Sequence, residues 1–134
     1  MTKEQLKQYR DIKKERDNLL ELLNRLDATI SGIGSPSFEA MPHVNEIVSK
    51  VETQAIRRME LTARYEAKVA ELTDALQRIE TAIESLQPRE RTLIRLYYIE
   101  GLTWEEVAVK LNYTWRHTHR IHSNALNQLK AQTD

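Results

Sequence analysis

The stretch that decides the fold of the C-terminal part of the chain is GLTWEEVAVKLNYTWRHTHR, residues 101–120. Thr103 and Glu106 have the spacing of a capping box, which opens a short helix expected to run through Leu111. After a tight turn, Thr114 caps a longer helix. A short helix, a brief turn and a longer helix form the geometry that places the second helix in the major groove of DNA. The stretch therefore predicts a helix-turn-helix.

Another helix is expected over residues 88–99, directly before this stretch. Pro88 suits the first position of a helix, where its missing N–H costs nothing, and Gly101 suits the end. Apolar and small side chains at helical spacing predict the core that these helices share. That core consists of Leu93, Ile94, Leu96, Tyr97, Val107, Ala108, Leu111, Thr118, Ile121, Ala125, Leu126 and Leu129, with Tyr98 as a further candidate.

The charge of the chain is unevenly distributed, although its formal net charge is +0. Residues 107–133 contain no Asp or Glu, and the cations of this stretch are Lys110, Arg116, Arg120 and Lys130. A local basic surface on a neutral chain is typical of a protein that binds nucleic acid.

The N-terminal part of the chain predicts two long helices. The first spans residues 2–31 and opens with a capping box of Thr2 and Gln5, and two Gly and two Pro within residues 32–42 end it. The second spans residues 43–86, where apolar residues recur at alternating spacings of four and three, which is typical of a coiled-coil seam. At 1.5 Å per residue this helix is a rod of roughly 65 Å.

A rod of that length exceeds what the core of one small chain covers, so we expect a homo-oligomer, most simply a dimer. The first helix can fold back antiparallel along part of the rod, and a purely intrachain helical hairpin is the alternative. The residues expected between subunits are Val69, Leu72, Leu76, Ile79 and Ile83.

The predicted fold class is all-α. A long helical hairpin or coiled coil that serves oligomerisation is expected over residues 1–85, and a helix-turn-helix DNA-binding domain over residues 86–134. Only 3 Gly and 3 Pro are present in 134 residues, which favours long helices over a sheet with many turns.

Two segments of the C-terminal part, LQPRER at residues 86–91 and LYYIEGLTWEEVA at residues 96–108, carry a family resemblance. With the later Leu111, Ala125 and Leu129, they resemble the C-terminal DNA-binding domain of bacterial sigma factors. The resemblance implies reading of promoter DNA and contact with the flap of RNA polymerase. With a coiled-coil N-terminal half, the whole chain is similar to small phage-encoded late-transcription regulators of the ArpU and RinA type.

The resemblance also implies that the first exposed residues of the last helix face the bases, and these are Trp115, Arg116, His119 and Arg120. Arg116 and Arg120 are four residues apart on one helical face, and each guanidinium can donate two hydrogen bonds to guanine. Trp115 stacks on a sugar or contacts a thymine methyl, or instead covers the turn against Tyr113. Phosphate or water-mediated contacts are expected on the flanks, from His117, His122, Ser123 and Asn124. Lys110 and Arg89 are further candidates for contacts with the DNA backbone.

No catalytic pattern is visible in the sequence, so we expect no enzyme and no cofactor. The chain has no Cys, and in a helix His117 and His119 diverge by about 200°, which argues against a metal site. No apolar run reaches the ~20 residues of a membrane span and no signal peptide is present, so we expect a cytoplasmic protein. The resemblance to phage-encoded regulators implies that it acts in a bacterial host.

The leading hypothesis is a sequence-specific regulator of transcription, controlling phage late genes, with double-stranded DNA as its partner and host RNA polymerase as a further candidate. The first alternative is a DNA-packaging protein like a small terminase subunit, although such proteins usually place the DNA-binding unit first. The second alternative is an adaptor that binds RNA polymerase without reading DNA.

Overall fold

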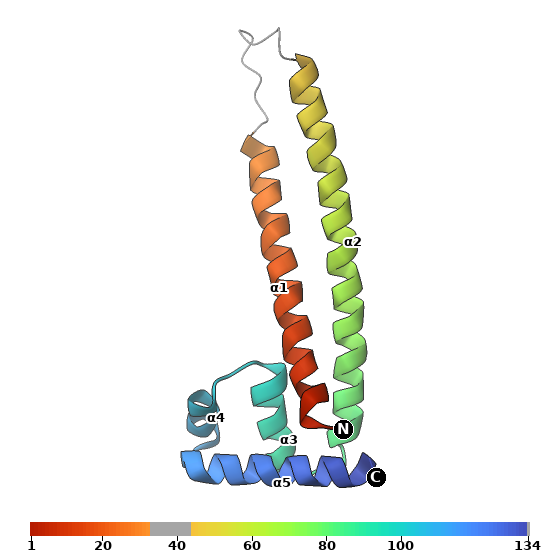
Figure 1. Cartoon of the computed structure of the whole chain (residues 1–134). Helices are drawn as coiled ribbons and strands as arrows, with labels where there is room; N and C mark the ends of the chain where they lie inside the picture. The colour runs from red at the N-terminus through yellow and green to blue at the C-terminus, as the bar shows by residue number, and fades with distance from the viewer. Residues whose placement is uncertain (33–43, 134) are drawn as a thin grey trace. The chain divides into compact units, whose positions relative to one another are not determined.

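The computed structural model describes residues 1–32 and 44–133, and this part of the chain is helical and contains no strand (Figure 1). The all-α prediction is therefore confirmed. The elements are α1 (Lys3–Gly32), α2 (Val44–Ile83), α3 (Pro88–Ile94), η2 (Arg95–Ile99), α4 (Trp104–Leu111) and α5 (Trp115–Thr133). The break between the two long helices was predicted within residues 32–42. Residues 33–42 of this break lie outside the described residues.

The capping box predicted at the start of α1 is present. The Thr2 backbone N–H donates to Gln5 Oε1 at 2.9 Å, and the Gln5 backbone N–H donates to Thr2 Oγ1 at 3.4 Å. Each side chain thus satisfies a backbone donor that has no partner within the helix, which fixes where α1 begins.

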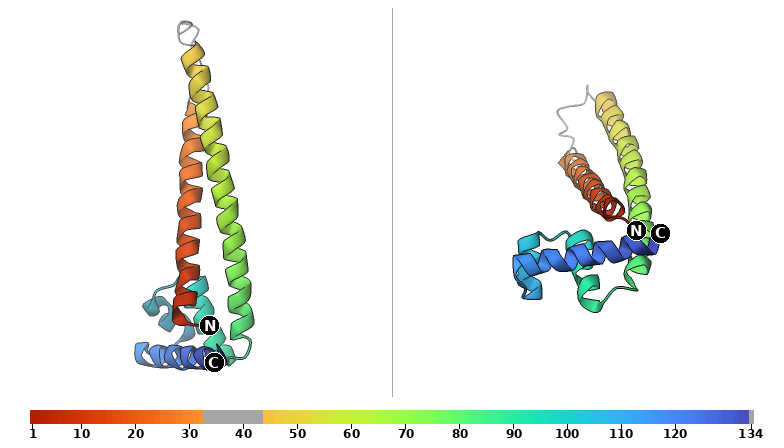
Figure 2. Two further views of the ribbon diagram at one scale, coloured as in Figure 1. Left: turned by 45° about the vertical axis from the view of Figure 1, so that its right-hand side comes forward. Right: turned by 60° about the horizontal axis from the view of Figure 1, so that its bottom comes forward.

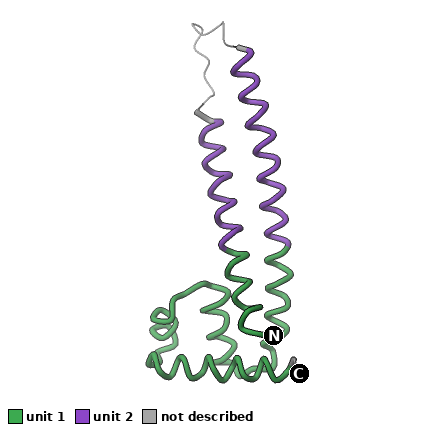
Figure 3. The backbone as a smooth tube through the Cα atoms, in the orientation of Figure 1, with its two compact units in different colours: residues 1–13, 71–134 green, residues 14–70 purple. Residues whose placement is uncertain are grey.

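The chain divides into two compact units (Figure 3). One unit contains residues 1–13 and 71–134, and the other contains residues 14–70. This division differs from the predicted boundary between residues 85 and 86. The reason is that the first turns of α1 and the last turns of α2 share a core with the helices that follow Leu86.

The unit of residues 14–70 is a pair of helices that lie side by side, formed by parts of α1 and α2 (Figure 2). Two ion pairs set the antiparallel register, from Arg58 Nε to Asp27 Oδ1 at 2.6 Å and from Lys68 Nζ to Glu15 Oε2 at 2.7 Å. Most of these four side chains are well exposed, so each pair adds little stability. The pairs show instead which turns of the two helices face each other.

The core of the other unit joins the predicted helix-turn-helix residues to both long helices. Its buried members from the long helices are Leu6, Tyr9, Leu72, Ala75, Ile79 and Ile83. Leu72, Ile79 and Ile83 are at most 7% exposed within the single chain, because they pack with the start of α1 and with α3 and α5. The prediction that these three residues form the contact between subunits is therefore wrong.

The helix predicted over residues 88–99 is present in two parts. Glu90 Oε2 accepts the Gln87 backbone N–H at 3.3 Å at its start, and α3 then continues into the π-helical turn η2. The Glu100 N–H donates to the Arg95 carbonyl at 2.8 Å, five residues back. The wider turn ends at Gly101, whose φ of 78° lies in the left-handed region that glycine adopts without strain.

The two helices of the helix-turn-helix begin and end at local signals. Thr103 Oγ1 accepts the Glu106 N–H at 3.2 Å at the start of α4, and Asn112, with a φ of 60°, ends that helix in the left-handed conformation. Thr114 Oγ1 then accepts the His117 N–H at 3.2 Å at the start of α5. The predicted caps by Thr103 and Thr114 and the tight turn are confirmed. The capping box of Thr103 and Glu106 is only half formed, because Glu106 Oε1 accepts the Thr103 hydroxyl at 3.1 Å and not its backbone N–H.

Candidate nucleic-acid interface

One face of α5 is held firmly in the core. Thr118, Ile121, Ala125 and Leu129 are each at most 2% exposed, and their spacings of three and four place them on one side of the helix. Thr118 Oγ1 also donates to the Thr114 carbonyl at 2.8 Å, so its hydroxyl is satisfied inside the core. The buried face fixes which side of α5 remains outside.

The opposite face of α5 carries the predicted base-reading residues. Arg116, Arg120 and Ser123 are exposed, and Trp115 is 58% exposed. Among the described residues, no side-chain hydrogen bond or ion pair involves the guanidinium group of Arg116 or Arg120. Two free guanidinium groups on one face of a helix without acidic residues are available for an anionic or polar ligand.

Four rings form a continuous row of contacts that ends at one edge of this exposed face, and we call Tyr97, Trp104, His119 and Trp115 the aromatic cluster. Tyr97 stacks on Trp104 with ring centroids 3.8 Å apart, and Trp104 lies 4.6 Å from His119. His119 lies in turn 3.9 Å from Trp115. The cluster thus connects η2, α4 and the first turns of α5.

The aromatic cluster decides how two of the predicted DNA contacts are presented. The His119 ring is half-buried beside Trp104 and Trp115, and its Nε2 atom is buried with no hydrogen-bond partner among the described residues. Trp115 packs on His119, whereas Tyr113 has its edge-on ring contact with His117, 4.8 Å away. The Trp115 ring is therefore exposed on one side and packs against the His119 ring on the other.

His122 does not lie on the surface, so the expectation that it contacts phosphate is wrong. Its side chain is buried, and its Nε2 atom lies 2.7 Å from the hydroxyl oxygen of Tyr98. The Tyr98 residue is itself completely buried. Burial lowers the pKa of His122 to about 4, and the positive charge of Lys3 adds to this effect. Burial likewise raises the pKa of Tyr98. Both groups are neutral near pH 7 and form a polar pair inside the core.

Lys110 and Ser123 are exposed, as a backbone contact requires. Lys110 Nζ lies 3.8 Å from Glu100 Oε2, a long ion pair between two exposed side chains. Such a pair is weak in water, so Lys110 can exchange it for a phosphate. His117 is half-buried against Tyr113 and presents only part of its ring.

The sequence analysis missed the attachment of α1 to these helices. The Met1 ammonium donates to the Leu129 carbonyl at 3.3 Å, and Lys13 Nζ donates to the Ile99 carbonyl at 2.8 Å. The Arg10 guanidinium lies 4.4 Å above the centre of the Tyr97 ring. The buried Leu6 and Tyr9, three residues apart, were the available signal for a core face on these first turns.

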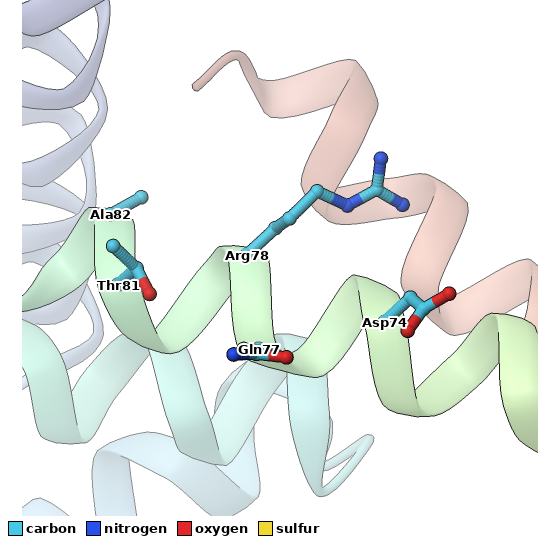
Figure 4. A pocket seen from close by; sticks show the side chains of 5 residues that line it. All are labelled: Asp74, Gln77, Arg78, Thr81 and Ala82. Carbon is cyan, nitrogen blue, oxygen red and sulfur yellow. The ribbon is translucent and has the colours of Figure 1, made fainter.

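The described surface has shallow hollows. One of them is lined by a single helix, α2, through Asp74, Gln77, Arg78, Thr81 and Ala82 (Figure 4). No group of three metal-ligating side chains converges anywhere in residues 1–32 and 44–133. None of the described helices is long and apolar enough to cross a membrane.

The comparison with known proteins agrees with this geometry. The family model of Sigma-70, region 4 matches residues 82–131. This match supports a DNA-binding helix-turn-helix domain like that of sigma factors. The RNA polymerase sigma factor FliA of Salmonella typhimurium is 36% identical over 59 residues, which are 44% of this chain and 25% of that protein. FliA of Salmonella typhi matches with the same values. The chain thus spans about a quarter of the length of the curated relatives it matches, and no solved structure matches it significantly.

Proposed function

We propose that this protein is a sequence-specific DNA-binding regulator of transcription that reads the major groove with α5. The observation that carries the proposal is the pair of exposed, unpaired guanidinium groups of Arg116 and Arg120 on one face of that helix. Arg donates two parallel hydrogen bonds to the N7 and O6 acceptors of guanine, which is the commonest specific contact in the major groove.

The remaining residues of the interface have supporting roles in this proposal. The exposed Trp115 ring packs against a sugar or a thymine methyl, and the half-buried His119 holds that ring in place. Phosphate contacts in this proposal are assigned to Ser123, His117 and Lys110. Phosphate contacts set the register of the protein on DNA, and the two Arg side chains read the sequence.

RNA polymerase is the second partner in the proposal. The support is the match of residues 82–131 to Sigma-70, region 4, together with sigma factors among the relatives. Because the whole chain resembles phage-encoded late-transcription regulators, we assign it to the control of phage late genes. An adaptor that binds only RNA polymerase is disfavoured by the free Arg116 and Arg120, and a packaging protein by the position of the DNA-binding unit at the C-terminal side.

A homodimer also belongs to the proposal, because two recognition helices would read two half-sites of one operator. Its contact cannot use the buried Leu72, Ile79 or Ile83, so we assign it to exposed positions of the same heptad pattern, Val48 and Val51. These side chains are 48% and 43% exposed. Val51→Asp should convert a dimer to a folded monomer in light scattering, and an unchanged mass would place the contact elsewhere.

The proposal is tested by selecting binding sites from a random pool of duplex DNA and measuring the affinity of the protein for the enriched sequence. We expect a consensus to emerge and log affinity to fall linearly with log salt concentration, with a slope of about −0.9 for each phosphate contacted. Absence of binding to every duplex at 50 mM salt would refute the DNA-binding function.

A further inference from the structure

Trp115 is a large aromatic residue that stays exposed at the start of α5. It is the first residue of the helix, directly before Arg116, and 58% of its surface is accessible. Within residues 1–32 and 44–133 its indole N–H donates to no other group. Trp115 therefore offers an apolar ring and an unused hydrogen-bond donor beside an Arg side chain that we assigned to base reading.

The other rings of the aromatic cluster hold Trp115 in place. Its ring centroid lies 3.9 Å from that of His119, and the row of contacts continues through Trp104 to Tyr97. All four residues belong to the same compact unit as the rest of the helix-turn-helix. A ring that is already packed on one side loses little conformational freedom when a ligand covers its other side. The open side of the Trp115 ring is thus prepared for a contact in one defined position.

The place of Trp115 on α5 favours contact with a base. In a helix-turn-helix bound to DNA, the N-terminal residues of the recognition helix contact the base edges in the major groove. The side chains of a helix also lean towards its N-terminus. The first side chain of α5 consequently lies at the end of the helix that meets the bases in the proposed complex.

The chemistry of the Trp115 side chain matches one base. The methyl group at C5 of thymine is the apolar group that the four bases present in the major groove, and the O4 acceptor of thymine lies next to it. An indole offers an apolar ring for the methyl group and one N–H for the acceptor. Guanine, adenine and cytosine present hydrogen-bonding groups there without a methyl group.

We propose that Trp115 is a specificity-determining residue that selects a thymine in the binding site by packing its ring on the C5-methyl group. This inference rests on the proposed DNA-binding function and deepens it, because it assigns one base to one residue and decides for the methyl group over a sugar. The thymine lies close to the guanine that Arg116 reads, since the two residues are neighbours in the helix.

The test replaces each thymine of the selected duplex in turn by deoxyuridine, which lacks the methyl group and keeps every hydrogen-bonding group of the base. Fluorescence anisotropy of the labelled duplex gives the affinity of the full chain at one salt concentration. At one thymine per recognition helix the affinity should fall about fourfold, the factor that corresponds to one methyl group leaving an apolar contact. Deoxyuridine at the other thymine positions should change the affinity much less.

The variant Trp115→Ala shows whether this methyl contact belongs to the indole ring. It should bind the selected duplex more weakly than the native protein does. It should also bind the thymine and deoxyuridine duplexes equally well, because the methyl group then has no partner.

Val109→Ala is the matched control, since Val109 is an apolar residue of α4 that is 81% exposed. This control should keep the native fourfold difference between the thymine and deoxyuridine duplexes. Circular dichroism should show native helix content for both variants, because both side chains are exposed.

The inference is overturned if the selected sequence contains no thymine, or if no deoxyuridine substitution weakens binding by the native protein. It is also overturned if Trp115→Ala keeps the fourfold difference. Equal losses of affinity for selected and scrambled duplex in Trp115→Ala would overturn it too, because the ring would then contact a sugar. In all these cases the proposed function stands. A native protein that binds no duplex at low salt contradicts the proposed function itself, and this inference with it.

Discussion

Removing one hydroxyl from the core tests how α5 is attached to the rest of the helix-turn-helix. Tyr98→Phe deletes the oxygen that lies 2.7 Å from His122 Nε2 and leaves the shape of the ring unchanged. Tyr98 is completely buried and His122 is 6% exposed, so water cannot replace the lost partner. The ring nitrogen of His122 is then left buried without a hydrogen bond.

The expected cost follows from this burial. A buried polar group that loses its only partner costs about 1–3 kcal/mol, so we expect the free energy of unfolding to fall by about 2 kcal/mol. For a chain of this size that corresponds to a decrease in Tm of about 5–10 °C. The polar pair is the only part of the core that the substitution touches, and no apolar contact is lost.

Urea and thermal unfolding followed by circular dichroism measure the effect. Tyr113→Phe is the matched control, because its hydroxyl is in no hydrogen bond recorded among the described residues and its ring packs on His117. This control should unfold within about 0.5 kcal/mol of the native protein. A Tyr98→Phe protein as stable as the control would refute the reasoning, since the Tyr98–His122 pair would then contribute nothing.

Two further predictions concern pH and the backbone. His122 has a pKa of about 4 in the folded protein and about 6.5 when unfolded, so the unfolded chain takes up the proton first as the pH falls. The free energy of unfolding should be highest above pH 6.5 and fall by about 2 kcal/mol towards pH 4. In the His122→Gln variant the decrease that His122 causes should be absent. A native pH profile in that variant would show that another group causes the decrease. Gly101→Ala should lower the free energy of unfolding by about 1 kcal/mol through backbone strain at its φ of 78°, because the added Cβ meets nothing within 4 Å. An unchanged urea midpoint would contradict this expectation and show that the backbone relaxes.

The sequence predicted best those features that neighbouring residues determine. Thr103 and Thr114 cap their helices through side chains that bond three residues ahead, so the starts of α4 and α5 could be placed directly. The π-helical turn was not predictable, because the apolar spacing over residues 94–99 fits a normal helix as well. Local patterns specify where helices begin and end and leave their finer geometry to the core.

Features that depend on distant residues were harder to predict. The heptad pattern correctly indicated that Leu72 and Ile79 are buried, but it could not tell whether a second chain or the start of α1 covers them. The attachment of Arg10 to Tyr97 joins residues 87 positions apart, and no local signal encodes it. His122 was within reach of prediction, since it lies four residues after Thr118 on the buried face of α5.

The candidate site was predicted in outline and corrected in detail. Arg116 and Arg120 are exposed as expected, because nothing on that face of α5 packs against another helix. The ring of His119 lies beside two tryptophans with a buried Nε2, and its contact with the bases stays a prediction. Whether a polar ring points outward depends on which large side chains stand next to it in space.

The claim that α5 reads bases is tested most directly by measuring how Arg116→Ala and Arg120→Ala change the affinity for a selected duplex and for a scrambled duplex at one salt concentration. Each substitution should weaken the selected site by about 1–3 kcal/mol per recognition helix, change scrambled binding much less, and leave Tm nearly unchanged. Equal losses on both duplexes would contradict the account, because the two side chains would then contact only phosphate.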